Sequence, residues 1–200
     1  MGKFMVDKIG ASVAFAVLAI PMVAVAIVIR LSSPGPVIHW SRRFGVNNVL
    51  FYMPKFRTMR VGTPQLATDV LGDPANWLTP VGGFLRKTSL DELPQLWSVL
   101  AGHMSLVGPR PALFNQYELI AKRRDAGVTE LRPGITGWAQ VNGRDDVTDD
   151  EKLRLDCFYL RNHSVALDVK ILLITVLKVV RMDGVWGTGS SRRVTARHGV

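Results

Sequence analysis

An uncharged apolar stretch near the N-terminus limits the folds open to this chain more than any other feature. Residues Ile9 to Ile29 (IGASVAFAVLAIPMVAVAIVI) carry no charged side chain over 21 positions. As a helix that rises 1.5 Å per residue, they would extend about 31 Å, roughly the thickness of a bilayer's hydrocarbon core. Pro21 lies near the middle, where it removes a backbone hydrogen bond and clashes with the preceding turn. The sequence therefore predicts a membrane helix with a break or kink at Pro21.

Three membrane arrangements compete for this stretch. A cleaved signal peptide could use Ala24-Val25-Ala26, but the apolar stretch is too long and Asp7 is misplaced. A straight span passes the hydropathy test, yet the positive-inside rule assigns it no orientation, because basic residues lie on both sides. A re-entrant helix-break-helix that enters and leaves on the cytoplasmic face would put both basic flanks on the favoured side, and we favour it. The flanking residues are Lys3, Lys8, Arg30, Arg42 and Arg43.

The charge balance restricts the partners. The 200 residues include 25 Lys and Arg against 16 Asp and Glu, a net charge of +9 that suits acidic lipids, phosphorylated substrates or nucleic acid. Because the basic residues are spread along the chain, a membrane surface or a phosphate site is favoured over nucleic acid. The single cysteine, Cys157, excludes an intrachain disulfide, and no Cys/His metal-ligand spacing occurs. Exposure of the soluble part to the cytosol is compatible with this composition.

The chain is long enough for one modest domain and a membrane anchor. We assign the anchor and a turn-rich linker to residues 1–36, the folded domain to 37–186 and a flexible tail to 187–200. Short extended pieces over Val37–Met59 predict a hairpin, and closely spaced Gly and Pro over residues 60–80 predict an irregular loop.

Apolar residues at spacings of three and four predict three amphipathic helices. They run over Ser89–Leu100, Leu113–Ala126 and Asp149–Asn162. The apolar segment Ala166–Met182 carries four charges, which are too costly for a free-standing span. An interfacial amphipathic helix and a partly buried core helix fit this segment equally well. The expected class is α+β, mainly helical: a monotopic membrane protein with a re-entrant anchor and interfacial helices.

Two adjacent carboxylates, Asp91 and Glu92, lie among basic residues. Ser89 to Glu92 also fits a capping box, the simpler interpretation of the tetrapeptide alone. Pro94 tolerates only an early helical position, so it places both acids at a helix start, where anions bind naturally. A carboxylate there, with its pKa lowered, stays ionised and can act as a nucleophile or a Mg²⁺ ligand. The basic residues are Lys55, Arg57, Arg86, Lys87, Arg110, Arg132 and Arg144.

Other motifs allow a structural as well as a functional interpretation. Arg110 lies between two prolines, which suits bidentate binding of a phosphate but also a rigid turn. The segment Arg132–Gly137 is either a structural turn, which we favour, or a glycine-rich approach to a ligand. His103 and Cys157 are expected to be structural, and the acidic residues between 145 and 151 are expected to form a solvated helix start.

Four motifs in order resemble those of the bacterial sugar transferases, and more narrowly the small monotopic phosphoglycosyl transferases, of which the PglC enzymes are the minimal form. The resemblance runs from the N-terminal apolar segment to about Met182. The motifs are KFRTM (Lys55–Met59), SLDELPQL (Ser89–Leu96), MSLVGPRP (Met104–Pro111) and RPGITGWAQVNGR (Arg132–Arg144).

The resemblance implies an enzyme of the bacterial inner membrane whose catalytic domain, residues 37–186, faces the cytoplasm. It would move a sugar-1-phosphate from a UDP-sugar to undecaprenyl phosphate with Mg²⁺ and release UMP, as the first membrane step of a glycoconjugate pathway. Asp91 would be the nucleophile of a ping-pong reaction and a metal ligand, and Glu92 would aid Mg²⁺ placement or proton handling. The implied phosphate and substrate residues are Lys55, Arg86, Arg110, Arg132, Gln140, Arg144 and Asp156.

The chain departs from the family pattern at two positions. Ile20 stands before Pro21 where the family often has Ser, so no hydroxyl is present to bond the freed carbonyl. His103 stands before Met104 where an acidic residue is common. No motif here distinguishes one sugar from another, and exposed Trp with the apolar C-terminal helix could serve a homodimer or the bilayer. The alternative function is a non-catalytic membrane scaffold that binds acidic lipid or nucleic acid; the ordered motifs favour the enzyme.

Overall fold

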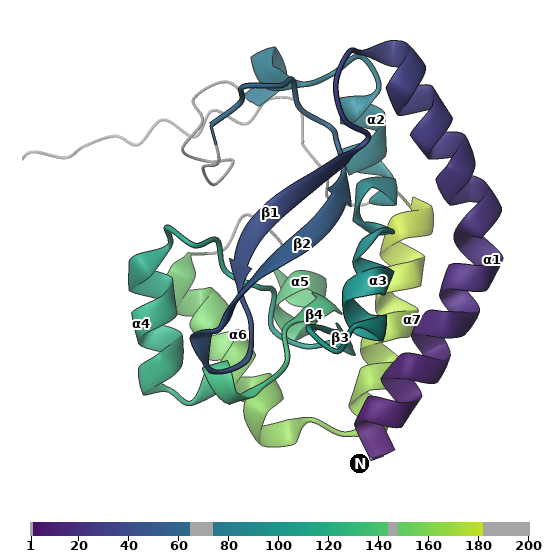
Figure 1. Cartoon of the computed structure of the whole chain (residues 1–200). Helices are drawn as coiled ribbons and strands as arrows, with labels where there is room; N and C mark the ends of the chain where they lie inside the picture. Colours follow the sequence, from purple (N-terminus) through teal and green to yellow (C-terminus); the bar gives the residue numbers. More distant parts are fainter. Residues whose placement is uncertain (1, 65–73, 144–147, 182–200) are drawn as a thin grey trace, which may run out of the picture.

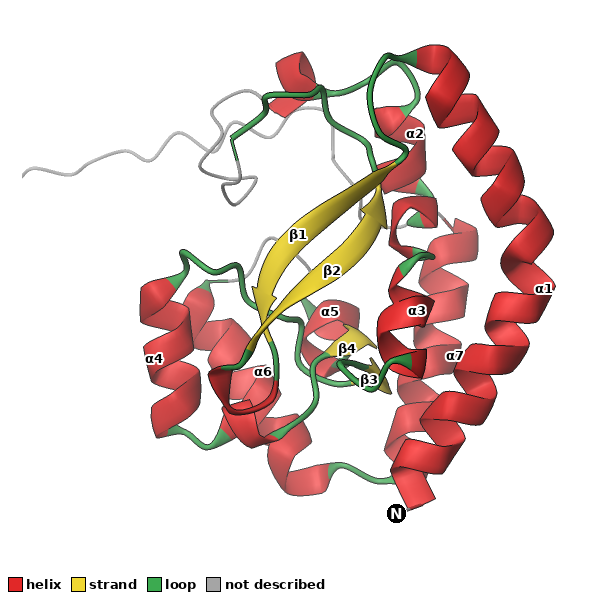
Figure 2. Ribbon diagram, viewed as in Figure 1, coloured by secondary structure: helices red, strands yellow, loops and turns green. Residues whose placement is uncertain are grey.

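The computed structural model of the chain describes residues 2–64, 74–143 and 148–181 and is mainly helical, as the sequence predicted (Figures 1 and 2). The α-helices are α1 (Gly2–Ser32), α2 (Gly82–Lys87), α3 (Gln95–Leu100), α4 (Tyr117–Asp125), α5 (Trp138–Asn142), α6 (Asp149–Asn162) and α7 (Val165–Arg181). The strands are β1 (Ile38–Phe44), β2 (Leu50–Phe56), β3 (Ser105–Val107) and β4 (Gly134–Thr136). Short 3-10 turns are η1 (Val46–Asn48), η3 (Pro74–Trp77), η4 (Leu90–Glu92) and η5 (Val128–Glu130). The predicted tail, 187–200, lies outside the described residues, and the division into domains stays a prediction.

Helix α1 is one helix with Pro21 inside it, so the predicted break is absent from its secondary structure, and the re-entrant membrane arrangement stays a prediction. Its axis bows around one side of the molecule (Figure 1). A proline removes only its own N–H bond, and packing of the inner face against the domain holds the remaining turns in place. Within the described ranges, α1 is the one helix long and apolar enough to cross a membrane. Its outer face is apolar and exposed, with Val13, Val17, Ile20, Val23, Ile27 and Leu31.

The first turns of α1 are tied to the folded domain by polar contacts. Buried Asp7 accepts hydrogen bonds from the Ser105 hydroxyl (2.8 Å) and from the backbone N–H of Leu106 (3.2 Å). Lys3 Nζ lies 2.6 Å from a carboxylate oxygen of Asp168 on α7. Buried charges are stable only when they are paired in this way, so these contacts fix the start of α1 against β3 and α7.

The residues directly after α1 are held by a second set of contacts. Buried Arg57 donates to the carbonyl and to the hydroxyl of Ser33, both at 2.9 Å, and to the carbonyl of Pro34. Gly35 follows with a φ of +117°, and a Cβ there would collide with the Arg57 guanidinium. Both ends of α1 are therefore bound to the same domain.

The predicted hairpin within Val37–Met59 is confirmed. Strands β1 and β2 pair antiparallel from Ile38↔Phe56 to Phe44↔Leu50, and β3 and β4 form a separate parallel pair. Helix α3 packs between β2 and α1, where Phe51 and Met53 of the hairpin meet Leu96 and Val99. This cluster places the hairpin next to η4, the turn that carries the acidic pair. Of the predicted loop 60–80, the described part contains η3 and a bridge between Met59 and Leu78.

The predicted helix over Ser89–Leu100 is interrupted, and the predicted capping box is wrong. Ser89 has a left-handed backbone (φ 58°), and its side chain makes no capping bond. The 3-10 turn η4 follows, and Pro94 stands at the N-cap of α3 because it has no N–H to continue a helix. The six-residue helix α2 just before this turn was not predicted.

The other predicted helices are present. Asp149–Asn162 has the predicted bounds, and its N-cap Thr148 accepts a hydrogen bond from the Glu151 N–H (3.3 Å). Helix α4 is shorter than the predicted Leu113–Ala126. In α7, Asp168 and Ile171 are buried, whereas the opposite side exposes an apolar row. That row consists of Val165, Val169, Leu173, Val176 and Val180.

Candidate active site

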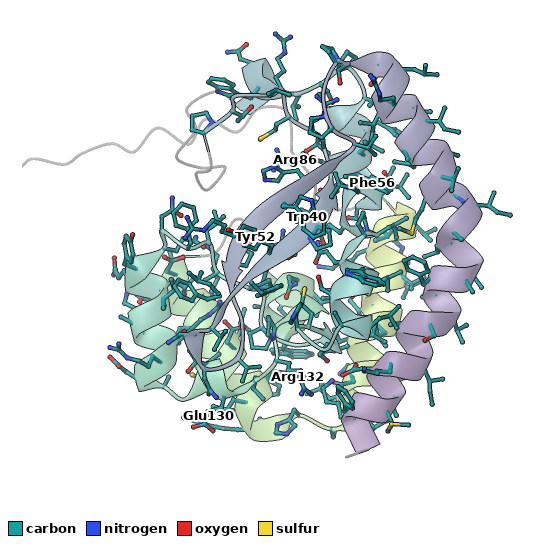
Figure 3. All side chains as sticks on the ribbon, viewed as in Figure 1. Trp40, Tyr52, Phe56, Arg86, Glu130 and Arg132 are labelled. Carbon is teal, nitrogen blue, oxygen red and sulfur yellow. The ribbon has the colours of Figure 1, made fainter. Side chains whose placement is uncertain are left out.

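The acidic pair lies in η4, a single turn between α2 and α3. The left-handed Ser89 reverses the chain after α2, and this reversal carries Asp91 and Glu92 beneath the hairpin. Asp91 is 7% exposed and lines a cleft of about 450 Å³. The cleft is bounded by the hairpin, by residues 57–64 and by Arg86 of α2, which Figure 3 labels near one end of the hairpin. This volume is in the range of small-molecule sites.

Two cations hold Glu92. Lys55 Nζ on β2 and Arg110 Nη2 on the loop after β3 lie 2.7 and 2.9 Å from the same oxygen, Oε1. Charge-assisted hydrogen bonds of this length are strong in a part-buried site. Glu92 is therefore neutralised by its neighbours, while Asp91 remains the carboxylate on the cleft wall.

The environment separates the two carboxylates electrostatically. Burial raises the pKa of Asp91 from 3.8 to about 6, and the charge of Glu92 adds to this, against the opposing effects of Lys55, Arg86 and Arg110. Burial also acts to raise the pKa of Glu92, but Arg110 and Lys55 outweigh it and hold that pKa well below its ordinary value. The predicted lowering of the pKa is therefore right for Glu92 and wrong for Asp91. A carboxylate with a raised pKa is more basic and a better nucleophile once ionised.

The motifs GPRP and PGITG pack back to back. Gly108 N–H donates to Thr136 O and Gly134 N–H to Pro109 O, each at 2.9 Å. A Cβ on Gly108 would collide with the carbonyl of Arg132, and a Cβ on Gly137 would collide with the carbonyl of Gly108. The glycines thus allow two backbones to touch, which supports the structural interpretation of PGITG. Its contribution to the site is to support the loop that carries Arg110.

Not all predicted site residues meet at the cleft. Lys55, Arg86 and Asp91 line it, and Glu92 and Arg110 lie beside them, since Glu92 is paired with both Lys55 and Arg110. Arg144 lies outside the described residues, and Asp156, Arg132 and Gln140 do not line the cleft.

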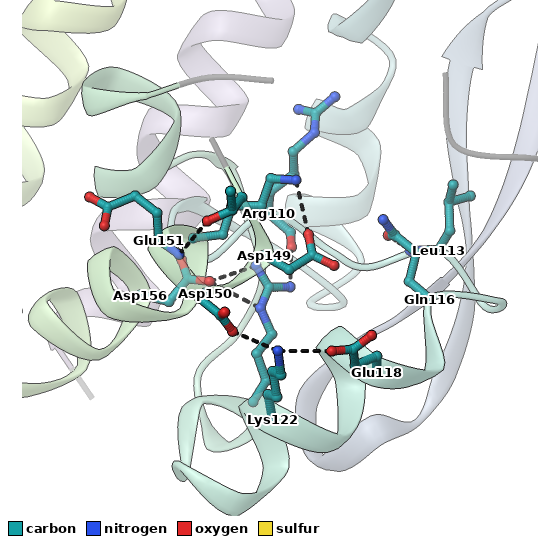
Figure 4. A network of polar contacts seen from close by, with 12 residues as sticks. Arg110, Leu113, Gln116, Glu118, Lys122, Asp149, Asp150, Glu151 and Asp156 are labelled. Atoms are coloured by element: carbon teal, nitrogen blue, oxygen red, sulfur yellow. Dashed lines mark hydrogen bonds and ion pairs between the residues drawn. The ribbon is translucent and has the colours of Figure 1, made fainter. Parts of the chain in front are cut away.

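Asp156 is 1% exposed on α6, and its Oδ2 accepts hydrogen bonds from Nη2 (2.6 Å) and Nε (3.0 Å) of Arg123. Figure 4 shows Asp156 within this polar network, near Arg110, while Lys122 links Glu118 and Asp150 at its edge. Asp156 is thus enclosed by protein and does not line the cleft.

Arg132 and Gln140 are also away from Asp91. The Arg132 guanidinium lies 4.8 Å from the centre of the Phe4 ring, near the start of α1, and Figure 3 labels it far from Arg86. Gln140 donates to the Ile135 carbonyl (3.1 Å), and within the described residues its buried Oε1 has no hydrogen-bond partner.

Sequence reasoning missed two arginines, Arg43 in the cleft wall and Arg123 behind the loop that carries Arg110. Arg43 lines the cleft from β1, and its pKa is lowered to about 9, chiefly by burial and then by the nearby charge of Arg110. The hairpin pairing of Arg43 with Phe51 places it on the same face as Lys55, a signal that a known register would have given. Arg123 had no such signal, because it stands in a run with Lys122 and Arg124.

The fit of the predicted Mg²⁺ can be examined through its oxygen donors. Among the described residues, no group of three or more His, Cys, Asp or Glu side chains could hold a metal ion. Magnesium, however, commonly binds one or two carboxylates together with substrate phosphates and water. Asp91 offers such a carboxylate at the cleft wall, whereas Glu92 is committed to Lys55 and Arg110. The residues therefore fit a Mg²⁺ ion that is held by Asp91 and shared with a phosphorylated ligand.

A carboxylate and several cations around one cleft, beside a long apolar helix, define a membrane-associated protein equipped for phosphate chemistry. The model of the family described as bacterial sugar transferase matches residues 1–182, and the chain belongs to this family.

Three relatives illustrate the similarity. Over 161 residues the chain is 43% identical to the uncharacterized sugar transferase EpsL of Bacillus subtilis (strain 168), covering 80% of this chain and 78% of that protein. Over 192 residues it is 40% identical to the UDP-glucose:undecaprenyl-phosphate glucose-1-phosphate transferase of Xanthomonas campestris pv. campestris, covering 90% of this chain and 39% of that protein. Over 183 residues it is 37% identical to the UDP-N-acetylgalactosamine-undecaprenyl-phosphate N-acetylgalactosaminephosphotransferase of Aeromonas hydrophila, covering 86% of this chain and 43% of that protein. The chain thus spans about two-fifths of the length of the last two.

Proposed function

We propose that this protein is a phosphoglycosyl transferase that moves a sugar-1-phosphate from a UDP-sugar to undecaprenyl phosphate and releases UMP. The observation that carries the proposal is the division of labour in the acidic pair: Asp91 lines the cleft, and Glu92 is neutralised beside it. The names of two relatives give UDP-sugars and undecaprenyl phosphate as substrates, which supports the same substrate classes here. Those relatives differ in the sugar, so the donor is specified only as a UDP-sugar.

In the first step an oxygen of ionised Asp91 attacks the β-phosphorus of the donor. A bond from this oxygen to phosphorus forms, the bond from the β-phosphorus to the bridging oxygen breaks, and UMP leaves with that oxygen and its electron pair. In the second step an oxygen of undecaprenyl phosphate attacks the same phosphorus. The bond to Asp91 breaks, the carboxylate is restored, and the diphosphate-linked sugar leaves on the lipid. The order of events is that of ping-pong kinetics.

The surrounding charges reduce the repulsion between a carboxylate and a pyrophosphate. Arg86 lines the same cleft as Asp91, and Lys55 and Arg110 lie on the side of Glu92. Such preorganised positive charge stabilises the phosphate oxygens where negative charge develops. Glu92 fixes the two cations and, through its charge, keeps Asp91 basic. A Mg²⁺ ion held by Asp91 would further neutralise the phosphate oxygens.

We also propose that α1 is re-entrant, on the cytoplasmic face of the bacterial inner membrane, and that α7 lies in the membrane interface. Both ends of α1 are bound to one domain, by Asp7 and Lys3 at the start and through Arg57 at the end. A crossing helix would part these contacts. The apolar outer faces of α1 and α7 would then contact lipid. The homodimer stays a prediction.

Topology can be tested with a membrane-impermeant thiol reagent. Gly2→Cys and Pro36→Cys, each made with Cys157→Ser, should both be labelled in inverted vesicles and neither in intact spheroplasts. Labelling of the two ends from opposite sides would exclude the re-entrant helix.

Activity is tested by UMP release from a panel of UDP-sugars with undecaprenyl phosphate and Mg²⁺. Asp91→Asn should abolish release, whereas Glu118→Gln, which removes an exposed carboxylate, should leave it unchanged. With donor alone, the wild type should gain the mass of a phosphosugar, and Asp91→Asn should not. Near-normal turnover by Asp91→Asn would refute the mechanism. Salt-sensitive lipid binding without UMP release would instead indicate the scaffold.

A further inference from the structure

We infer that Arg123, itself held by Asp156, is a positioning residue for Arg110. The inference rests on the proposed function, because it concerns the arginine that contacts Glu92 in the candidate site. Arg123 does not line the 450 Å³ cleft, so any effect on the reaction has to pass through another residue.

The loop that carries Arg110 is fixed from outside. Its two prolines have no N–H to donate, and four consecutive carbonyls each accept a hydrogen bond from another part of the chain. The bonds are Gly134 N to Pro109 O (2.9 Å), Arg123 Nη1 to Arg110 O (2.7 Å), Arg43 Nη1 to Pro111 O (3.0 Å) and Phe44 N to Ala112 O (3.1 Å).

The bond to the Arg110 carbonyl is made by a guanidinium that cannot turn freely. Arg123 is 7% exposed, and two of its nitrogens, Nε and Nη2, are bound to Oδ2 of Asp156. That pairing fixes the plane of the guanidinium and leaves Nη1 directed at the carbonyl of Arg110. Asp156 thus sets the orientation of Arg123, and Arg123 sets the backbone of Arg110.

A purely structural role would be to join α4 to α6. The ion pair with Asp156 alone would achieve that, without a third bond to the backbone of Arg110. The neighbouring Arg124 shows the contrast: its side chain is 65% exposed, and among the described residues its one ion pair is with Asp125. Because a displacement of about 1 Å at a reacting centre can cost about a hundredfold in rate, the backbone position of Arg110 matters to turnover.

A double-mutant cycle tests this dependence. Arg123→Lys keeps the positive charge but cannot bind Asp156 twice and also reach the carbonyl, so it should lower kcat for UMP release about tenfold. In an Arg110→Ala background the same change should cost less than about twofold. Arg124→Lys is the matched control and should change neither background. An equal loss in both backgrounds, or no loss in the wild type, would overturn the inference.

A second measurement does not depend on turnover. Phenylglyoxal labels free guanidinium groups, and peptide masses report the labelling rate of Arg110 separately. Arg123→Lys should raise the labelling rate of Arg110 several-fold. The double variant Arg123→Met with Asp156→Leu removes both buried charges together, so it should fold, and it should raise the labelling rate of Arg110 as well. Unchanged labelling in a folded variant would overturn the inference. If the wild type releases no UMP from any donor, the proposed function fails, and the labelling still decides the role of Arg123.

Discussion

Replacing Asp91 by asparagine is expected to stabilise the protein at neutral pH while it removes activity. The folded state raises the pKa of Asp91 from 3.8 to about 6, chiefly through burial. Between these values the folded protein keeps a proton that the unfolded chain has released, so stability falls as the pH rises across this window. At 1.36 kcal/mol per pKa unit, the loss above pH 6 amounts to about 3 kcal/mol.

Asparagine resembles the protonated acid and does not undergo this loss. The free energy of unfolding of Asp91→Asn should therefore exceed that of the wild type by about 3 kcal/mol at pH 7.5. For a chain of this length, this corresponds to a rise in Tm of roughly 6 to 12 °C. Below pH 3.8 the two proteins should unfold alike, because both then carry a neutral side chain.

The assay is thermal or urea unfolding in detergent micelles at pH 7.5 and near pH 3.8. Asp125→Asn is the matched control, because the side chain of Asp125 is 71% exposed and its change should shift Tm little. If Asp91→Asn is no more stable than the wild type at pH 7.5, burial is not straining the ionised carboxylate, and the account of its reactivity is wrong.

Three further outcomes are expected. The kcat/KM for UMP release should fall tenfold per pH unit below about pH 6, where Asp91 becomes protonated. Glu92→Gln should move this fall to lower pH, because the charge of Glu92 raises the pKa of Asp91. An unchanged pH profile in Glu92→Gln would assign the fall to a group other than Asp91. Gly108→Ala should lower the free energy of unfolding, measured by urea titration, by roughly 2 kcal/mol or more, because the new Cβ collides with the Arg132 carbonyl. Gly83→Ala should not lower it, because the new Cβ would lie 3.7 Å from the nearest side-chain atom, on Leu78. Val176→Lys on the exposed face of α7 should weaken binding to lipid vesicles about tenfold in a flotation assay. Unchanged binding would show that this face does not contact lipid.

Features that are determined by neighbouring residues could be predicted from the sequence. Helix α6 has the bounds that its apolar spacing predicted. Its N-cap is also local, because Thr148 accepts a hydrogen bond from the N–H of Glu151, three positions along the chain. The hairpin around Gly45 was equally local. The break in the predicted helix at Ser89 was not local, since nothing in the neighbouring residues indicates a left-handed serine. The turn that follows it, η4, packs against α2 and β2.

In the candidate site, too, local features could be predicted and contacts between distant residues could not. The basic surroundings of Asp91 and Glu92 were visible in the sequence, but their opposite pKa shifts depend on contacts between distant residues. Lys55 and Glu92 are 37 positions apart, and Arg123 and Asp156 are 33 apart. The family resemblance implied a substrate contact for Asp156, and only the fold shows that this residue is enclosed by protein and paired with Arg123.

The contact between Lys3 and Asp168 also bears on how the protein is made. It joins residues 165 positions apart, so the first turn of the anchor acquires its partner only when the last helix has been synthesised. At about 5 to 20 residues per second, that delay is roughly 8 to 33 s. During this interval the apolar segment is already outside the ribosome and its partners Arg57 and Ser105 have been synthesised, whereas its contact with α7 does not yet exist. On the proposal that α1 is re-entrant, we expect the segment to stay on a targeting factor or at the membrane surface until α7 has been synthesised and has docked on the domain.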